Sequence, residues 1–258
     1  MNILMTIDVG NTNISLGLMQ GNEVIGSFRL TTKTPRTSDE FGLCIKELLD
    51  MTKLQDDDIE AVIISSVVPK IMYSLTSAIV KFLHKDPIIV GPGIKTGISI
   101  RTDNPREVGA DRIVDISMAY HTYHKSCIIV DFGTATTFDY ISGEGVFKYT
   151  VIAPGLGIVA NALTSQTAKL PEIEIQKPES ILNGNTITGM QAGVIYGYIG
   201  SVEYIIKQMK KELKLKDCLV IATGGLGKVI AKETKEIDLF DPDVAYKGMR
   251  ILYDLNKK

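Results

Sequence analysis

The chain has 258 residues, of which 45% are hydrophobic and 22% are charged, and its formal net charge at pH 7 is −2. This length suffices for one large domain or two modest ones with a sizeable core, and the composition is typical of an ordinary globular protein. The near-neutral charge excludes an electrostatic argument for nucleic acid or an anionic membrane surface as a partner.

Three cysteines, Cys44, Cys127 and Cys218, lie far apart in the sequence. Their odd number and wide spacing argue against a disulfide framework or a metal knuckle, and favour a reducing compartment. The N-terminus lacks a basic region followed by a long apolar run, and no segment approaches about 18 uninterrupted apolar residues. We therefore expect a cytoplasmic protein without a membrane or nucleic-acid partner.

The first half of the chain predicts an α/β domain. Apolar runs indicate strands at 2–7, 13–19 and 23–31, a helix at 39–53, a strand at 61–69, a helix at 73–83 and a strand at 87–91. The order β-β-β-α-β-α-β indicates a mixed sheet with helices packed against it.

The turn after the first predicted strand, within "MTIDVGNTNI" (5–14), combines a carboxylate with small polar residues. Gly10 permits either a positive φ or a close approach to a ligand, and Asn11, Thr12 and Asn13 supply short donors and acceptors. Taken alone, this stretch favours an ordinary hairpin in which Asp8 and Asn11 satisfy their own turn.

The second half repeats this pattern after a loop at 91–109 and a predicted helix at about 111–124. "SCIIVDFGTATTFDYISGEGVF" (126–147) again reads as strand, Asp-x-Gly-Thr turn, strand, glycine turn and strand, so that Asp131 corresponds to Asp8. "CLVIATGGLG" (218–227) matches the strand at 61–69 in kind. We predict an internal duplication with domains at 1–117 and 118–258 and a cleft between them.

Two corresponding Asp-x-Gly turns are stronger evidence for a ligand-binding site than one such turn. Successive backbone N–H groups in such turns bind anions, and adjacent carboxylates bind the cations that accompany polyphosphate. The turns are therefore interpreted as binding the phosphates of a nucleotide, and phosphoryl transfer requires mainly positioning and charge stabilisation.

Five segments together resemble the type III pantothenate kinases: "DVGNTN" (8–13), "NPREVGADR" (104–112), "VDFGTATT" (130–137), "PG" (154–155) and "ATGGLG" (222–227). The resemblance covers nearly the whole chain in order. It implies two duplicated actin-like (ribonuclease H-like) domains, and ATP-dependent phosphorylation of pantothenate, the first step of coenzyme A biosynthesis. It also implies a homodimer in which the partner subunit helps to close the substrate pocket.

The resemblance also implies roles for individual residues. Asp111 resembles the general base, Asp8 lies near Mg²⁺, and Asp131 resembles the ligand of a monovalent cation, K⁺ or NH₄⁺. The implied ATP and phosphate contacts are Asp8, Val9, Gly10, Asn11, Thr12, Asn13, Thr134, Gly224 and Gly225. The implied pantothenate contacts are Thr102, Gly109, Ala110, Asp111, Arg112 and Thr186.

Other readings of these residues remain open. Asp at a helix start is a favoured N-cap, so Asp111 alone would favour capping over catalysis. The chain has Thr102 where family members often have Tyr, and Tyr149-Thr150 where many have Gly-Gly. We therefore expect either that the backbone near Tyr149 runs differently or that the two side chains project into space that relatives leave open. The alternative functions are a kinase for another small hydroxylated substrate, or a relative without turnover that acts as a regulatory binding protein.

Overall fold

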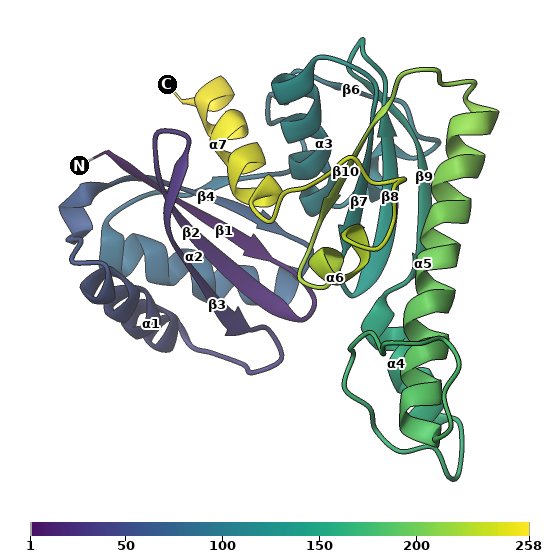
Figure 1. Cartoon of the computed structure of the whole chain (residues 1–258). Coiled ribbons are helices and arrows are strands. Elements are labelled where there is room, and N and C mark those ends of the chain that lie inside the picture. The colour runs from purple at the N-terminus through teal and green to yellow at the C-terminus, as the bar shows by residue number, and fades with distance from the viewer. Residues whose placement is uncertain (1, 258) are drawn as a thin grey trace. The chain divides into compact units, whose positions relative to one another are not determined.

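The computed structural model describes residues 2–257, which divide into two compact units. Unit 1 comprises residues up to Thr122 together with Asp243 onwards, and unit 2 comprises Tyr123–Pro242. Figure 1 shows the elements of each unit.

Unit 1 is built on a five-stranded sheet in the order β3-β2-β1-β4-β5. The β1, β2 and β3 strands form an antiparallel meander, and β4 runs parallel to β1, as does β5 to β4. The strands are β1 (Ile3–Val9), β2 (Asn13–Gln20), β3 (Glu23–Thr31), β4 (Ile59–Ser66) and β5 (Ile88–Ile89). These bounds confirm the predicted order β-β-β-α-β-α-β of the first half.

Two helices, α1 (Ser38–Met51) and α2 (Pro69–Leu83), cover one face of this sheet (Figure 1). Thr37 caps α1 with a capping box, because its side chain accepts from the Glu40 N–H and Glu40 reaches back to the Thr37 N–H. The buried face of α1, including Phe41, Ile45 and Leu49, packs on alternate residues of β1 such as Ile7.

The other face of the unit 1 sheet is covered by α3 (Ala110–Tyr123) and α7 (Val244–Asn256). Tyr246, Met249 and Leu252 of α7 pack with Leu4 and Met19. Gly17 of β2 lies directly under the Tyr246 ring, since a Cβ there would approach Cδ1 of that ring to 2.7 Å. A face of β1 that ends in Asp8 is therefore closed by a helix from the C-terminal end of the chain.

Unit 2 repeats the plan of unit 1. Its strands follow the order β11-β10-β7-β8-β9, in which β7, β8 and β9 form an antiparallel meander and β10 runs parallel to β7. The strands are β7 (Cys127–Phe132), β8 (Ala135–Ile141), β9 (Val146–Pro154), β10 (Leu219–Thr223) and β11 (Leu239–Phe240). Since β7 and β10 correspond to β1 and β4, the predicted internal duplication is confirmed.

The helices of unit 2 are α4 (Leu156–Ser165), α5 (Thr186–Glu212) and α6 (Gly227–Ala231). Val194, Tyr198 and Ile206 of α5 pack in one cluster with Val130 and Phe138 of the sheet. The segment between α4 and α5 has no helix or strand and wraps the N-terminal part of α5 (Figure 1).

Two details differ from the sequence-based domain boundaries of 1–117 and 118–258. The division between units falls after Thr122, near the end of α3, and α7 belongs to unit 1 instead of unit 2. The reason is packing, because the apolar side of α7 lies in the same hydrophobic cluster as Leu4 and Val114.

Three short elements complete the description of the fold: η1 (Asp56–Asp58), β6 (Ser99–Ile100) and η2 (Pro105–Glu107).

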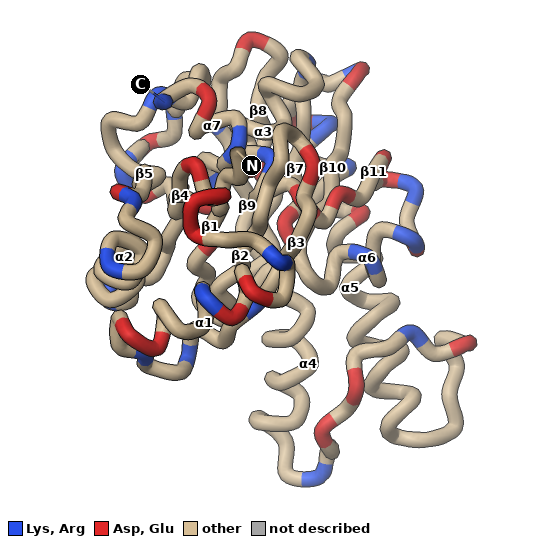
Figure 2. Tube along the Cα trace, turned by 90° about the vertical axis from the view of Figure 1, so that its left-hand side faces the viewer, with Lys and Arg blue, Asp and Glu red and all other residues tan. Residues whose placement is uncertain are grey.

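Charged residues of both signs are spread over the trace (Figure 2), and their formal sum is −2. Among residues 2–257, no helix has the length and apolar character needed to cross a membrane.

Candidate active site

The turn after β1 is built from Asp8 to Asn13. The Gly10 N–H donates to the Asn13 carbonyl at 3.0 Å, and Thr32 Oγ1 donates to the Gly10 carbonyl at 2.8 Å. Asn11, Thr12 and Asn13 are exposed. Gly10 does not take a positive φ, and a Cβ there would lie 3.3 Å from the Asn13 carbonyl oxygen, so a larger residue would be tightly placed against the turn.

Asp8 is partly buried at the end of β1 and lies near Asp111. The pKa of the Asp8 carboxyl is raised to about 7, chiefly by burial and also by the negative charge of Asp111, while the Ser65 hydroxyl acts in the opposite direction. The structure therefore brings together two of the carboxylates that the sequence singled out, and it perturbs one of them strongly. Such perturbed pairs are candidates for functional sites.

Asp111 is the second residue of α3 and not its N-cap, so the capping interpretation holds only in part. Its Oδ1 accepts a hydrogen bond from the Arg112 N–H at 2.8 Å, one of the first free amides of the helix. Oδ1 also occupies the position that a Cβ of Gly109 would take. Gly109 is thus required for the orientation of Asp111, which accounts for a Gly two residues before it.

Thr102 lies in a bend of unit 1, and its Oγ1 is buried without a hydrogen-bond partner. Ala110 and Arg112 are partly buried at the start of α3. Tyr149 and Thr150 lie in strand β9 opposite Tyr140 and Asp139, and neither has a positive φ. The pairing of β8 and β9 shifts register directly beside Tyr149, between Tyr140 and Ile141. The Tyr149 side chain is 44% exposed.

In unit 2, Asp131 takes the place that Asp8 has in unit 1. It is the penultimate residue of β7, and its carboxylate lies against two glycines. Gly224 has a φ of +90°, and a Cβ on it would lie 2.5 Å from Asp131 Oδ1 and 2.7 Å from the Phe132 backbone. Gly225, the next residue, is exposed with open space around it.

Thr134 and Thr186 lie elsewhere in unit 2. Thr134 is exposed in the turn between β7 and β8, and its carbonyl accepts the Gly155 N–H at 3.2 Å. This contact explains the "PG" segment, since a Cβ on Gly155 would collide with the Thr134 carbonyl. Thr186 is the exposed first residue of α5, whose N-cap Asn185 accepts the Thr188 N–H at 3.0 Å.

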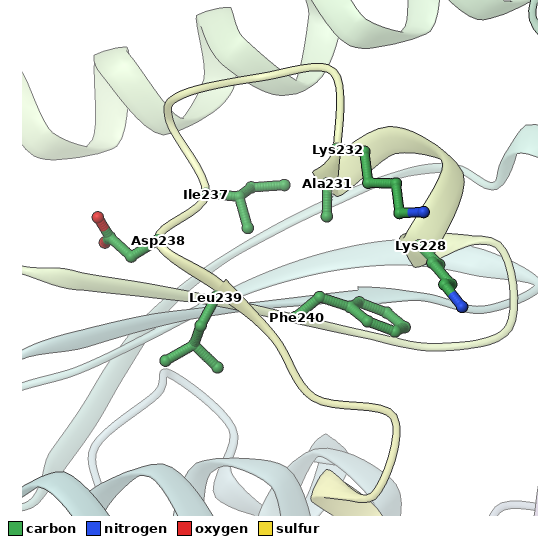
Figure 3. Close-up of a pocket in the computed structure, with 7 residues that line it drawn as sticks. All are labelled: Lys228, Ala231, Lys232, Ile237, Asp238, Leu239 and Phe240. Carbon is green, nitrogen blue, oxygen red and sulfur yellow. The ribbon is translucent and has the colours of Figure 1, made fainter.

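A pocket of about 220 Å³ lies between α6 and β11, just after the Gly224 turn (Figure 3). Its walls are mainly apolar, and two lysines stand at its edge; the lining residues are Lys228, Ala231, Lys232, Ile237, Asp238, Leu239 and Phe240. The Phe240 ring packs on Gly227, where a Cβ would approach to 2.9 Å.

Sequence reasoning missed two residues that lie beside Asp8. Ser65 of β4 is paired with Asp8 in the sheet, and Tyr246 of α7 interacts with Ser15 and lies near the Asp8 charge. The internal duplication could have indicated Ser65, because Thr223 is paired with Asp131 in the second half as Ser65 is paired with Asp8 in the first. No local pattern indicates Tyr246, which reaches the site through a contact distant in sequence.

Metal ligation by the protein alone is limited. Within residues 2–257 there is no group of three or more His, Cys, Asp or Glu side chains arranged to hold a metal ion. One or two carboxylates with substrate phosphates are, however, the usual ligand set of Mg²⁺, and Asp8 beside Asp111 fits it. A cation there would favour the ionised form that burial and Asp111 oppose.

Solved structures share this fold. The chain superposes on a candidate 2-dehydro-3-deoxygalactonokinase of Sinorhizobium meliloti with a TM-score of 0.62, at 11% identity, covering 99% of this chain and 97% of that one. The component A of (R)-2-hydroxyglutaryl-CoA dehydratase of Acidaminococcus fermentans gives 0.52, at 14% identity, covering 98% and 97%. At these identities the likeness concerns the fold alone.

Two duplicated α/β units, each with a carboxylate and a glycine turn after its first strand, are thus the fold that the chain shares with these structures. The chain belongs to the type III pantothenate kinase family, whose model matches residues 4–208. A type III pantothenate kinase of Agathobacter rectalis is 50% identical over 251 residues, covering 97% of this chain and 96% of that protein. The Bifidobacterium longum (strain DJO10A) protein of the same name is 49% identical over 256 residues, covering 99% and 100%.

Proposed function

We infer that the chain transfers the γ-phosphoryl group of ATP to the primary hydroxyl of pantothenate, giving 4′-phosphopantothenate for coenzyme A biosynthesis. Relatives that are about half identical over nearly the whole chain carry the name of this activity. The observation that carries the inference is the pair Asp8 and Asp111, two carboxylates close together where a strand ends and a helix begins.

Asp111 is the proposed general base. The attacking hydroxyl loses its proton as the bond to phosphorus forms, and a positioned carboxylate accepts that proton. Gly109 and the Arg112 amide hold the Asp111 carboxylate in one orientation, which supports this role. Arg112 is proposed to bind the carboxylate of pantothenate, since a guanidinium donates two parallel hydrogen bonds to such a group. Thr102, Ala110 and Thr186 are the remaining proposed pantothenate contacts.

The proposed phosphate contacts are the turn from Asp8 to Asn13 in unit 1 and Thr134 in unit 2. Both turns expose short polar groups, as phosphate binding requires. Gly224 and Gly225 are the proposed adenosine-side turn. The neighbouring pocket between α6 and β11 supports this assignment, because apolar walls suit a base and Lys228 suits a phosphate.

Two cations complete the proposal. Mg²⁺ would be held by Asp8 with the ATP phosphates, and it would supply charge neutralisation at the transferring group. A monovalent cation, K⁺ or NH₄⁺, would be held by Asp131, whose carboxylate is fixed against Gly224 and Gly133.

A homodimer is proposed through the exposed face of α5. Gly189, Gly193 and Gly197 recur every four residues along it, and each has open space where a side chain would be. Tyr204, 65% exposed, and Ile187, 49% exposed, lie on the same helix. Open space at glycines and exposed apolar side chains on one helix support a two-fold interface, in which the same patch of both subunits meets. The free cysteines support a reducing, cytoplasmic location.

Coupled measurement of ADP formation tests the proposed function. The purified chain is assayed with ATP and Mg²⁺, with pantothenate, with a panel of sugars, and with no acceptor. We expect ADP formation to depend on pantothenate and to be faster in potassium than in sodium. A sugar-dependent rate would indicate the alternative kinase, and acceptor-independent background alone would indicate a binding protein.

A further inference from the structure

The hydroxyl of Ser65 is buried and has no hydrogen-bond partner of good geometry, although it lies close enough to Asp8 to lower the pKa of that carboxyl. Ser65 is 0% exposed, and Ser65 Oγ, Thr102 Oγ1 and Ser117 Oγ are the buried side-chain oxygens without a partner among residues 2–257. Buried polar groups without partners are rare in native proteins because water has been removed and nothing replaces it. Neighbouring Ser66 is different, since its Oγ accepts the Val68 N–H at 3.1 Å and supports the turn after β4.

The position of Ser65 connects it to the site. In the parallel pairing of β1 and β4, Ser65 lies directly beside Asp8, so both side chains point to the same face of the sheet. The hydroxyl is near enough to act on the Asp8 carboxyl, although the two do not form a well-aligned bond in this state. A hydroxyl without a well-aligned partner thus lies beside a carboxylate that can accept its hydrogen bond.

Unit 2 repeats this pairing. Asp131 of β7 lies beside Thr223 of β10, at the corresponding place of the duplicated sheet. Thr223 is buried as well, with 6% exposure. Each unit therefore has a hydroxyl residue on the parallel neighbour of its site aspartate. A structural requirement for a small side chain would be met equally by Ala or Val, whereas a hydroxyl in both units indicates a role for the oxygen.

We propose that Ser65 is a positioning residue for Asp8, and that its hydroxyl donates a hydrogen bond to the Asp8 carboxylate when that carboxylate engages the cation and phosphates of ATP. This inference rests on the proposed function and adds a residue to it. An ionised carboxylate is a stronger acceptor than a neutral one, so the bond forms in the loaded state. Partners of this kind fix the orientation of a ligating carboxylate, and their removal typically lowers affinity or activity about 10- to 100-fold.

The test compares Ser65→Ala with the matched control Ser117→Ala, since Ser117 is an equally buried serine of the same unit without a partner. Removing an unsatisfied hydroxyl leaves no donor unpaired, so both variants should unfold at or above the wild-type temperature. Only Ser65→Ala should lose kcat, by about 10-fold or more, with the KM for pantothenate unchanged. Ser65→Thr, which keeps the hydroxyl, should retain kcat within about 3-fold.

Calorimetric titration with ATP and Mg²⁺ gives a readout that does not need pantothenate. Ser65→Ala should bind about 10-fold more weakly than wild type, and Ser117→Ala should bind equally well. If wild type fails to phosphorylate pantothenate while this binding difference is found, the proposed function fails and the role of Ser65 stands.

Three results would overturn the role of Ser65. The first is unchanged kcat and ATP binding in Ser65→Ala, and the second is an equal loss in Ser117→Ala. The third is a loss of kcat that accompanies a lowered unfolding temperature. If Ser65→Thr does not fold, Ser65→Cys, a weak donor of similar size, should have a kcat between those of the Ala variant and wild type.

Discussion

Asp8 is held where its charge is unfavourable, and the stability of the protein should show it. Its pKa rises from 3.8 to about 7, chiefly through burial and also through the charge of Asp111. At a pH below 3.8 the Asp8 side chain is neutral in both the folded and the unfolded state, so its ionisation does not affect stability. As pH rises through this window the unfolded chain loses the proton first, and the folded state loses stability relative to it.

Asp8→Asn removes this charge and should therefore stabilise the protein more at about pH 8 than at about pH 5, by roughly 1–3 kcal/mol after allowance for partial exposure. Urea unfolding in the presence of a chelator measures the difference. Asp103→Asn, at an exposed position, serves as the control. A gain that is the same at both pH values would show that Asp8 ionises normally.

Gly224 determines where the Asp131 carboxylate lies. Its φ of +90° disfavours any side chain, and a Cβ would lie 2.5 Å from Asp131 Oδ1. Gly224→Ala should therefore displace Asp131 and lower kcat/KM for ATP about 100-fold, with a loss of roughly 1–3 kcal/mol in stability. Steady-state kinetics and thermal unfolding measure both effects.

The control for Gly224→Ala is Gly157→Ala. Gly157 lies in α4 of the same unit, where an added Cβ meets nothing within 4 Å. Alanine is favoured over glycine in a helix by about 1 kcal/mol, so this variant should be fully active and no less stable. Equal activity of the two variants would contradict the role given to Gly224.

At the scale of elements, the local sequence pattern predicted the strands well, but it did not predict the unit to which α7 belongs. Alternating or continuous apolar residues identify β1 to β4 because each strand buries at least one face. The destination of α7 depends on its contacts with Leu4 and Met19, which are far away in sequence. Chain order alone therefore assigned it to the second domain.

The exposed glycines of α5 lead to a prediction about the proposed homodimer. Gly197→Leu should occupy the space that a second helix needs and raise the dimer dissociation constant at least about 10-fold, as measured by sedimentation. The side chain has room in the single chain, so folding should be unaffected. Gly91→Leu, at another glycine with open space, should leave the oligomer unchanged. A monomeric wild type would refute the α5 interface.

At the scale of the whole molecule, the duplication made the equivalent positions of Asp8 and Asp131 predictable from the sequence. The repeated Asp-x-Gly turns indicated two equivalent strand ends. In the structure, Asp8 is the penultimate residue of β1 and Asp131 is the penultimate residue of β7, the first strand of each unit. The partners of those aspartates, Ser65 and Thr223, required the sheet register, which no single segment of sequence contains. The sequence thus indicated the aspartates that we propose as ligand contacts, and the structure added the hydroxyl residues beside them.

The central claim is that Asp111, beside Asp8, accepts the proton of pantothenate during phosphoryl transfer. The most direct measurement is kcat for pantothenate phosphorylation by wild type, by Asp111→Asn and by the exposed control Asp103→Asn, with unfolding temperatures recorded for each. We predict that Asp111→Asn loses roughly 10²- to 10⁴-fold in kcat while remaining folded, and that Asp103→Asn is unaffected. Retention of most of the turnover by Asp111→Asn would contradict the account.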